Sequence, residues 1–556
     1  MSMDDQNKKD LVIAFVAALI LVVALCCFFH PRWSTNDDVG YSMAAHGYGA
    51  FLNATPKFFF SNVLWGLLVQ SIPVINRVMG YSIATLGVLV VFAAVLFYAL
   101  RKFRAGWLTS IVVLVFLTIS PVLFPQFTIN AGLMTVGAVI CWRLYETGEG
   151  RRPAFICGCL LAFLGYLIRA NEFQLVLFVA LPLLPWKTMA RDRFAQIAAL
   201  FLLISIGGAR YIDRLAYEGE EWRDFLATRQ ALDGIIDHAA YPLLRERPEI
   251  LSQHGYSVND LDLISSWFFA DADILNPSAL NAMLAELGPP LIRPGARRLG
   301  WEGVKALTGG DMVMLFMGAL FLALGRPNSR LAATWALALA AFFLLGAIFR
   351  RPGVIRVYIP VLSLLAIAPF LFQNQALSPL PSILSRFRDL FRSMLRLCHP
   401  WRSWRSLSLG VLCALTFFIT VDAIRESRAL HAEDVKIRLG LKNFPVNTPV
   451  VIWGASFPLV AVYPVLRMPK VVREYQLYGL GTMTLAPGAL SYAEQAAGRG
   501  MVSRLLSPEG IPIIANSYML YERLATYCQE RFGGDLKELA SESYGRVSLT
   551  VQRCDR

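Results

Sequence analysis

The sequence predicts an α-helical polytopic membrane protein that carries a small exported α/β domain at its C-terminus. Of the 556 residues, 56% are hydrophobic and only 16% are charged, and the mean hydropathy is +0.51. A soluble globular protein cannot bury that much apolar surface. Apolar runs of about 15–20 residues recur along residues 1–424, and a helix of about 20 residues crosses the hydrocarbon layer while satisfying its own backbone. The remaining segment, 425–556, is long enough for one compact domain.

The first span is expected at Leu11–Phe29, directly after Lys8 and Lys9. The bulky Leu25 before Cys26 does not suit cleavage of a signal peptide, so this span is expected to remain as a signal anchor. Together with it, the apolar runs predict eleven spans, the others near 80–100, 107–124, 128–145, 154–169, 172–186, 196–211, 311–325, 331–349, 358–373 and 407–424.

Positive charge sets the expected orientation in the cell (inner) membrane. With a cytoplasmic N-terminus, the inner loops hold the clustered cations of 8–9, 101–104, 143–152, 187–193, 326–330 and 386–405. By the positive-inside rule, the first large loop (30–79), the second large loop (212–310) and the C-terminal domain (425–556) are then external. The net charge of +13 is attributed to this topology, and no basic and aromatic stripe indicates nucleic acid as a partner.

The first large loop contains a pair of adjacent acids, Asp37 and Asp38, shortly after the first span. Neighbouring carboxylates repel, so the pair needs a cation, a metal, a hydrogen-bond network or one raised pKa. A carboxylate there could take a proton from a sugar hydroxyl that attacks an anomeric carbon. The alternative is that Asn36 and Asp37 cap a short helix over Asp38–Ala45.

Two further features follow in the same loop. His46 could assist acid–base chemistry or bind substrate or a metal, although a lone loop histidine is more often neither. The apolar stretch Val63–Ile72 is short for a span and is closed by Pro73, which predicts a helix lying in the membrane interface.

The acidic pair after the first span, the interfacial helix, the eleven spans and the exported C-terminal domain together resemble the GT-C superfamily of polyprenyl-phosphate-dependent glycosyltransferases. In that superfamily an acid of the first loop is the catalytic base, so the resemblance gives this role to Asp37 or Asp38 without deciding between them. The chain lacks the Trp-rich Asp motif of oligosaccharyltransferases and has no close match to protein mannosyltransferases, which argues against a protein acceptor.

Arginines placed on the outer side interrupt the positive-inside pattern and are candidate ligands for the phosphate of a lipid-linked donor. They are Arg169, Arg350, Arg351 and Arg356, with Tyr358 beside the last. The alternatives are an ion pair between Arg169 and Glu172, and anchoring of Arg350 and Arg351 to lipid headgroups. Arg356 is the preferred phosphate ligand.

The second large loop and the C-terminal domain carry weaker indications. Asp271 and Asp273 could bind a divalent metal with the first-loop acids, although a solvated or capping role is favoured, and no other cofactor is indicated. In the C-terminal domain the pattern predicts a buried strand near 450–454, a helix over 516–532 and a half-buried strand near 547–551. Cys528 and Cys554 could form a disulfide in an oxidising compartment.

These features predict an inverting glycosyltransferase that moves a sugar from a polyprenyl-phosphate donor to a glycan or lipid acceptor at the outer face of the membrane. Its expected partners are the donor, the acceptor and membrane lipids. The open alternatives are a flippase or exporter of lipid-linked glycans, which would not need the paired acids, and an enzyme of the O-antigen ligase or polymerase type.

Overall fold

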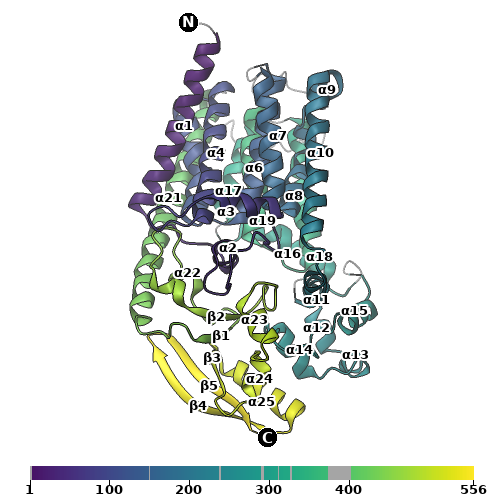
Figure 1. Ribbon diagram of the computed structural model, residues 1–556. Coiled ribbons are helices and arrows are strands. Elements are labelled where there is room, and N and C mark those ends of the chain that lie inside the picture. Colours follow the sequence, from purple (N-terminus) through teal and green to yellow (C-terminus); the bar gives the residue numbers. More distant parts are fainter. Residues whose placement is uncertain are drawn as a thin grey trace.

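The computed structural model describes residues 3–148, 151–236, 240–289, 293–310, 312–325, 328–372 and 402–555. Long helices form a bundle at one end of the molecule, and short helices and a sheet form the other end (Figure 1). The N-terminus lies at the far end of the bundle and the C-terminus at the far end of the sheet region. The predicted class, a mostly helical membrane protein with a small C-terminal α/β region, is confirmed at this level.

Seven helices of the described chain are long and apolar enough to cross a membrane. An eighth span results if α16 and α17, which meet at a bend of 79°, count as one. The seven are α1 (Met3–Phe28), α4 (Gly80–Lys102), α6 (Phe127–Glu146), α10 (Arg193–Ala216), α18 (Ser329–Phe349), α19 (Ile355–Ile367, continued by η4, Ala368–Phe372) and α21 (Arg402–Gly440). The bent pair is α16 (Ala296–Lys305, with η3, Ala306–Thr308) and α17 (Met312–Leu324).

Each of the eleven segments predicted as spans coincides with helical structure, because runs of apolar residues need both burial and internal backbone pairing. Only seven or eight of these segments are long and apolar enough in the described chain to cross a membrane. Three of these apolar helices are too short to count among the candidate spans: α5 (Trp107–Leu123), α7 (Arg151–Ile168) and α8 (Ala170–Ala180, with η1, Leu181–Leu183). A small helix, α9 (Trp186–Arg191), precedes α10. Arg326 and most of the predicted basic loop at 386–405 lie outside the described residues.

The first large loop forms two short helices at the end of the bundle, α2 (Asn36–His46) and α3 (Val63–Ser71) (Figure 1). Thr35 occupies the N-cap position of α2, so Asn36 and Asp37 lie inside the first turn and do not cap it. The predicted helix at Val63–Ile72 is present as α3, and the Asn62 side chain caps it by accepting a hydrogen bond from the Leu64 amide at 3.0 Å.

In its described residues, the second large loop contains five α-helices besides α16: α11 (Glu220–Ile236), α12 (Tyr241–Arg245), α13 (Pro248–Gln253), α14 (Val258–Ser265) and α15 (Pro277–Glu286). Ser257 caps α14 and forms a capping box with Asp260 at the start of that helix. The helices pack on one another and on the C-terminal domain through one shared apolar core.

The C-terminal domain contains a five-stranded mixed sheet in the order β2-β1-β3-β5-β4. β1 pairs in parallel with β2 and β3, while β5 is antiparallel to β3 and β4. The strands are β1 (Pro449–Trp453), β2 (Gln476–Leu480), β3 (Ile511–Ile514), β4 (Asp535–Tyr544) and β5 (Val547–Asp555), with the helices α22 (Leu459–Val462), η5 (Val471–Glu474), α23 (Leu490–Ala496), α24 (Met501–Leu505) and α25 (Tyr518–Phe532). The two predicted strands and the predicted helix are thus confirmed, and Cys528 and Cys554 form the predicted disulfide.

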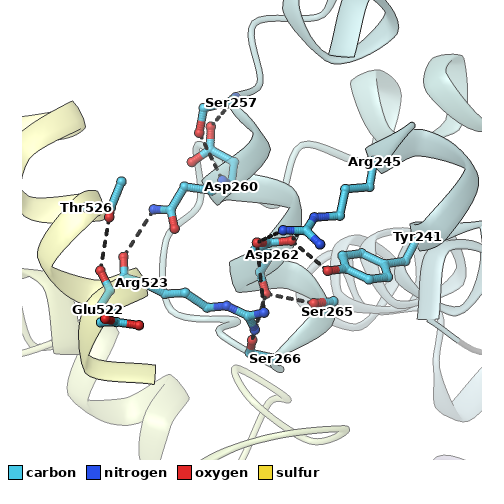
Figure 2. A network of polar contacts seen from close by, with 11 residues as sticks. Tyr241, Arg245, Ser257, Asp260, Asp262, Ser265, Ser266, Glu522, Arg523 and Thr526 are labelled. Atoms are coloured by element: carbon cyan, nitrogen blue, oxygen red, sulfur yellow. Dashed lines mark hydrogen bonds and ion pairs between the residues drawn. The ribbon is translucent and has the colours of Figure 1, made fainter. Parts of the chain in front are cut away.

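α25 holds the second large loop against the C-terminal domain. Figure 2 shows Arg523 reaching from α25 to the end of α14, where it donates a hydrogen bond to the Asp262 carbonyl oxygen at 3.0 Å and another to the Ser266 hydroxyl. On the other side of Asp262, the Tyr241 hydroxyl donates to its carboxylate at 2.7 Å (Figure 2). The loop and the domain are therefore joined by polar contacts as well as by their common core.

The C-terminal domain also contacts the first large loop. The Leu477 amide donates to the Gly49 carbonyl oxygen at 3.0 Å, and the Leu490 amide donates to that of Ala50 at 2.9 Å. α21 runs without a break through the expected domain boundary at 424/425 and ends at Gly440, close to the sheet. The domain is thus connected to the bundle by a continuous helix and is fixed over the loop that carries the acidic pair.

Candidate functional site

Asp38 is fully buried, and its carboxylate is held by three hydrogen bonds. Its Oδ2 atom accepts from the Thr35 hydroxyl at 2.8 Å, and its Oδ1 atom accepts from the Tyr81 hydroxyl at 2.9 Å and the Phe127 amide at 3.1 Å. Burial raises the pKa of Asp38 to about 7, although the three hydrogen bonds act in the opposite direction. The buried carboxyl therefore ties α2 to the first turns of α4 and α6.

Asp37 lies in a different environment from its neighbour. Its Oδ2 atom is 3.4 Å from Nη1 of Arg356, the second residue of α19, and both side chains are 30% exposed. Adjacent residues of a helix point in different directions, so one acid faces the protein interior and the other remains accessible. The structure thus brings together two of the predicted site residues, Asp37 and Arg356, that are 319 positions apart.

Arg169 lies at the break between α7 and α8 and belongs to the same neighbourhood. Its guanidinium carbon is 4.9 Å from the ring centre of Phe60 and 5.0 Å from that of Phe127, a cation–π arrangement. Its charge interacts with those of Arg356 and Asp37. We call Asp37, Asp38, Arg169 and Arg356 the first-loop site.

Aromatic residues form the packed side of the first-loop site. The ring of Tyr41 is stacked on Phe58 with centroids 5.1 Å apart, and it meets Phe127 edge-on at 4.9 Å. The Tyr41 hydroxyl accepts a hydrogen bond from the Phe60 amide at 3.1 Å. These contacts fix the orientation of α2, and with it the directions in which Asp37 and Asp38 point.

Glu172, which the sequence suggested only as an ion-pair partner of Arg169, is buried beside the site. It is 3% exposed, and its Oε1 atom has no hydrogen-bond partner among the described residues. Glu172 and Arg169 make no ion pair within 4 Å in the described structure, although their charges interact. A buried carboxyl with an unsatisfied oxygen is costly, and such groups occur at functional sites more often than elsewhere.

His46 has a positioning contact. Its Nε2 atom accepts a hydrogen bond from the Tyr81 amide at 3.2 Å, so it satisfies a backbone donor at the start of α4. Burial and the nearby charge of Arg473 lower the pKa of His46 to about 4, and the ring is therefore neutral near pH 7. His46 is linked to Asp38 of the first-loop site through Tyr81, whose hydroxyl donates to the Asp38 carboxylate.

The other predicted phosphate ligands are placed elsewhere. Tyr358 is buried, stacks on Phe342 at 4.1 Å and donates its hydroxyl to the Gly303 carbonyl oxygen at 2.9 Å. Arg350 ends α18 in a left-handed conformation and lies against Gly295. The charge of Arg350 interacts with the charges of Arg298 and Arg293, and not with those of the acidic pair. Arg351 is exposed in the turn that follows.

The acids of the second large loop do not meet the first-loop acids. Asp271 accepts a hydrogen bond from the Tyr527 hydroxyl of α25 at 2.6 Å, and it also accepts from the Asp273 amide at 3.0 Å. Across the described residues, no group of three or more His, Cys, Asp or Glu side chains could hold a metal ion. Asp271 thus serves the contact between the loop and the C-terminal domain.

No protein-family model, curated protein or solved structure matches this chain. The class that the fold defines is that of a multi-pass membrane protein with a small C-terminal domain containing a mixed sheet.

The first-loop site combines groups with complementary chemical abilities. An accessible carboxylate can accept a proton, and guanidinium groups can hold a phosphate through paired hydrogen bonds.

The sequence analysis did not identify Thr35 and Tyr81, whose hydroxyls hold Asp38, because a hydroxyl beside a buried acid leaves no local sequence pattern. Their positions near the starts of α2 and α4 are the only sign that the sequence offers.

Proposed function

We propose that this protein is an inverting membrane glycosyltransferase that moves a sugar from a polyprenyl-phosphate donor to a cell-surface glycan or lipid acceptor. The observation that carries the proposal is the partly exposed carboxylate of Asp37, 3.4 Å from Arg356 and within electrostatic range of Arg169. A general base next to cations that can hold a phosphate is what transfer from a phosphate-linked sugar requires.

Asp37 is the general base of the proposed reaction, because it is accessible whereas Asp38 is fully buried. The acceptor hydroxyl loses its proton to the Asp37 carboxylate while its oxygen forms a bond to the anomeric carbon. The bond between that carbon and the phosphate oxygen breaks, and the electron pair leaves with the polyprenyl phosphate. A single displacement of this kind inverts the anomeric configuration.

Arg356 and Arg169 hold the phosphate in this proposal. The phosphate gains negative charge as the bond to the sugar breaks, and a guanidinium fork placed there stabilises the transition state more than the ground state. The arginine stacked between Phe60 and Phe127 keeps its orientation, since the two rings restrict its side chain. When the donor is bound, Arg356 exchanges part of its contact with Asp37 for the phosphate and frees the carboxylate to act.

Asp38 is a positioning residue. Its hydrogen bonds to α4 and α6 fix the first turn of α2, where Asp37 also lies.

The proposed topology has eleven membrane spans, because α5, α7 and α8 are taken to cross the membrane as well. The second large loop and the C-terminal domain then lie outside. The disulfide between Cys528 and Cys554 supports an oxidising compartment for that domain.

The experiment that tests the proposed function is a comparison of cell-surface glycans with and without the gene, followed by transfer in proteoliposomes. Purified protein is incubated with a panel of polyprenyl-phosphate sugars and the glycan that accumulates in its absence. Release of polyprenyl phosphate with formation of the extended glycan is expected. Movement of the lipid-linked glycan across the bilayer without transfer would instead favour the exporter.

A further inference from the structure

A cavity of about 410 Å³ lies where three regions of the chain meet: the end of α1, the continuation of α21 beyond its apolar portion, and the segment around α22. This volume falls within the roughly 300–1,000 Å³ typical of ligand pockets. The cavity shares no residue with the first-loop site. Its lining consists of Cys26, Cys27, His30, Pro31, Arg32, His431, Asp434, Arg438, Val460, Pro464, Leu466, Arg467 and Pro469.

The charged residues of this lining are unbalanced, because it contains three guanidinium groups and one carboxylate. Asp434 is engaged by Arg32, whose Nε atom donates to both carboxylate oxygens at 3.0 and 3.2 Å. Arg438 donates through Nη1 to the Ala461 carbonyl oxygen at 2.6 Å. An arginine has five N–H donors, so Arg32 and Arg438 both retain donors beyond these contacts.

Arg467 adds a third cation to the cavity. It is exposed and adopts a left-handed backbone conformation, with φ of 55°. Its side chain forms no hydrogen bond or ion pair within the portion of the chain that the structure describes. A non-glycine residue in this conformation is strained by about 1 kcal/mol or more, and such strain is concentrated at functional sites.

Two stacked histidines form another portion of the lining. The rings of His30 and His431 are nearly parallel, with centroids 3.5 Å apart. The charge of Arg438 also acts on His431. The stacked imidazoles bring further N–H donors to a wall that already carries excess positive charge, which favours a negatively charged occupant.

The remaining lining is apolar and lies next to the membrane end of α1. Cys26 and Cys27 belong to the last turn of the candidate span Gln6–Phe28, and the end of a membrane span lies close to the phospholipid headgroups. Val460 and Leu466 provide an apolar surface on the side of the C-terminal domain. A ligand that joins a phosphate group to an aliphatic chain fits a cavity lining that is cationic in one part and apolar in another.

We propose that this cavity binds the phosphate group of an anionic ligand through Arg32, Arg438 and Arg467. The ligand is either a membrane phospholipid or a soluble phosphate. It contacts both α1 and the segment that follows α22, so its binding stabilises the attachment of the C-terminal domain to the bundle. The inference does not depend on sugar transfer, and its failure would leave the proposed function unaffected.

The test is the thermal unfolding of the full-length protein in detergent with three separate additions. Phosphatidylglycerol provides an anionic headgroup, phosphatidylcholine a phosphate without net charge, and inorganic phosphate a soluble anion, with chloride at equal ionic strength as reference. A ligand that binds only the folded protein raises the unfolding temperature as its concentration increases. A response to phosphatidylglycerol alone identifies a lipid, and a response to inorganic phosphate identifies a soluble ligand.

Variants decide whether the response comes from this cavity. Arg467→Gln removes a guanidinium that makes no hydrogen bond or ion pair in the described structure. Arg438→Gln removes a second guanidinium of the cavity. Each is expected to weaken binding roughly tenfold, the effect of losing a charge-assisted hydrogen bond. The control is Arg546→Gln, which breaks an exposed ion pair with Glu433 of α21 outside the cavity. The proposal is overturned if neither anion stabilises the wild type, if phosphatidylcholine stabilises it equally, or if Arg467→Gln and Arg546→Gln respond alike.

Discussion

The hydroxyl of Tyr81 donates a hydrogen bond to the buried Oδ1 atom of Asp38 at 2.9 Å, and the Tyr81 amide donates to His46 at 3.2 Å. A single residue at the start of α4 thus joins both ends of α2. The geometry of the first-loop site therefore depends on the docking of α2 against α4, and this docking depends on a carboxyl that is buried and titratable.

The raised pKa of Asp38 predicts a pH dependence of stability. The folded protein holds this proton up to a pH of about 7, whereas the unfolded chain releases it near 3.8. Because the folded state binds more protons between these values, the free energy of unfolding decreases as the pH rises through this window. Asp38→Asn removes this dependence, so the variant is expected to gain stability relative to wild type from pH 5 to pH 8.

The measurement is the unfolding temperature of both proteins at several pH values in this range. The control is Asp224→Asn, the same change at an exposed acid of α11. A constant difference between Asp38→Asn and wild type at all pH values would contradict the assignment of the titration to Asp38.

The donor-phosphate role predicts that Arg356→Ala lowers sugar transfer at least about 100-fold, the scale of losing one oriented charged donor. Arg356→Lys is expected to rescue little, because an ammonium cannot present the guanidinium fork. Arg350→Ala is the matched control, since that arginine lies against Gly295 and not beside Asp37. Transfer rates at varied donor concentration test this, and an equal loss in both alanine variants would place the phosphate elsewhere.

Much of the fold follows from the sequence, because an apolar run of sufficient length specifies a helix by itself. The eleven segments and the short helix α3 of the first loop could be located in this way. The contact between Asp37 and Arg356 could not, since it joins two helix starts 319 positions apart. Position relative to the membrane suggested Asp37 and favoured Arg356 over Arg350, but only tertiary packing shows that Arg356 lies beside Asp37 while Arg350 lies against Gly295.

The different environments of Asp37 and Asp38 also could not be predicted from the sequence. Asp37 and Asp38 are chemically identical in the sequence, and their difference arises from the direction in which each side chain leaves α2. The same is true of Tyr358, whose place beside Arg356 suggested a ligand, while its ring is stacked on Phe342 inside the protein.

The attachment of the second large loop to α25 predicts a local loss of order in Arg523→Ala. This change removes the hydrogen bonds to Asp262 and Ser266 and leaves their acceptors without these partners, a cost of about 1–3 kcal/mol. Hydrogen exchange of α14 is expected to accelerate while that of α4 is unchanged. Unaltered exchange in α14 would show that the apolar core alone holds the loop.

The proposed topology predicts opposite locations for two reporter fusions within α21. A reporter placed after Arg405 is expected in the cytoplasm, and one placed after Arg428 is expected outside, because the apolar portion of the helix lies between them. Reporter activity on each side of the membrane is the measurement. The same location for both fusions would refute the crossing of the membrane by α21, and a cytoplasmic reporter after Arg428 would refute the external position of the C-terminal domain.

The most direct test of the central claim is the rate of sugar transfer by Asp37→Asn, measured as recovery of the glycan that is lost without the protein. The asparagine retains the shape of the side chain but cannot accept the proton. If Asp37 is the general base, transfer falls at least about 100-fold while membrane insertion and the unfolding temperature stay close to those of wild type. Transfer at the wild-type rate by Asp37→Asn would contradict the account.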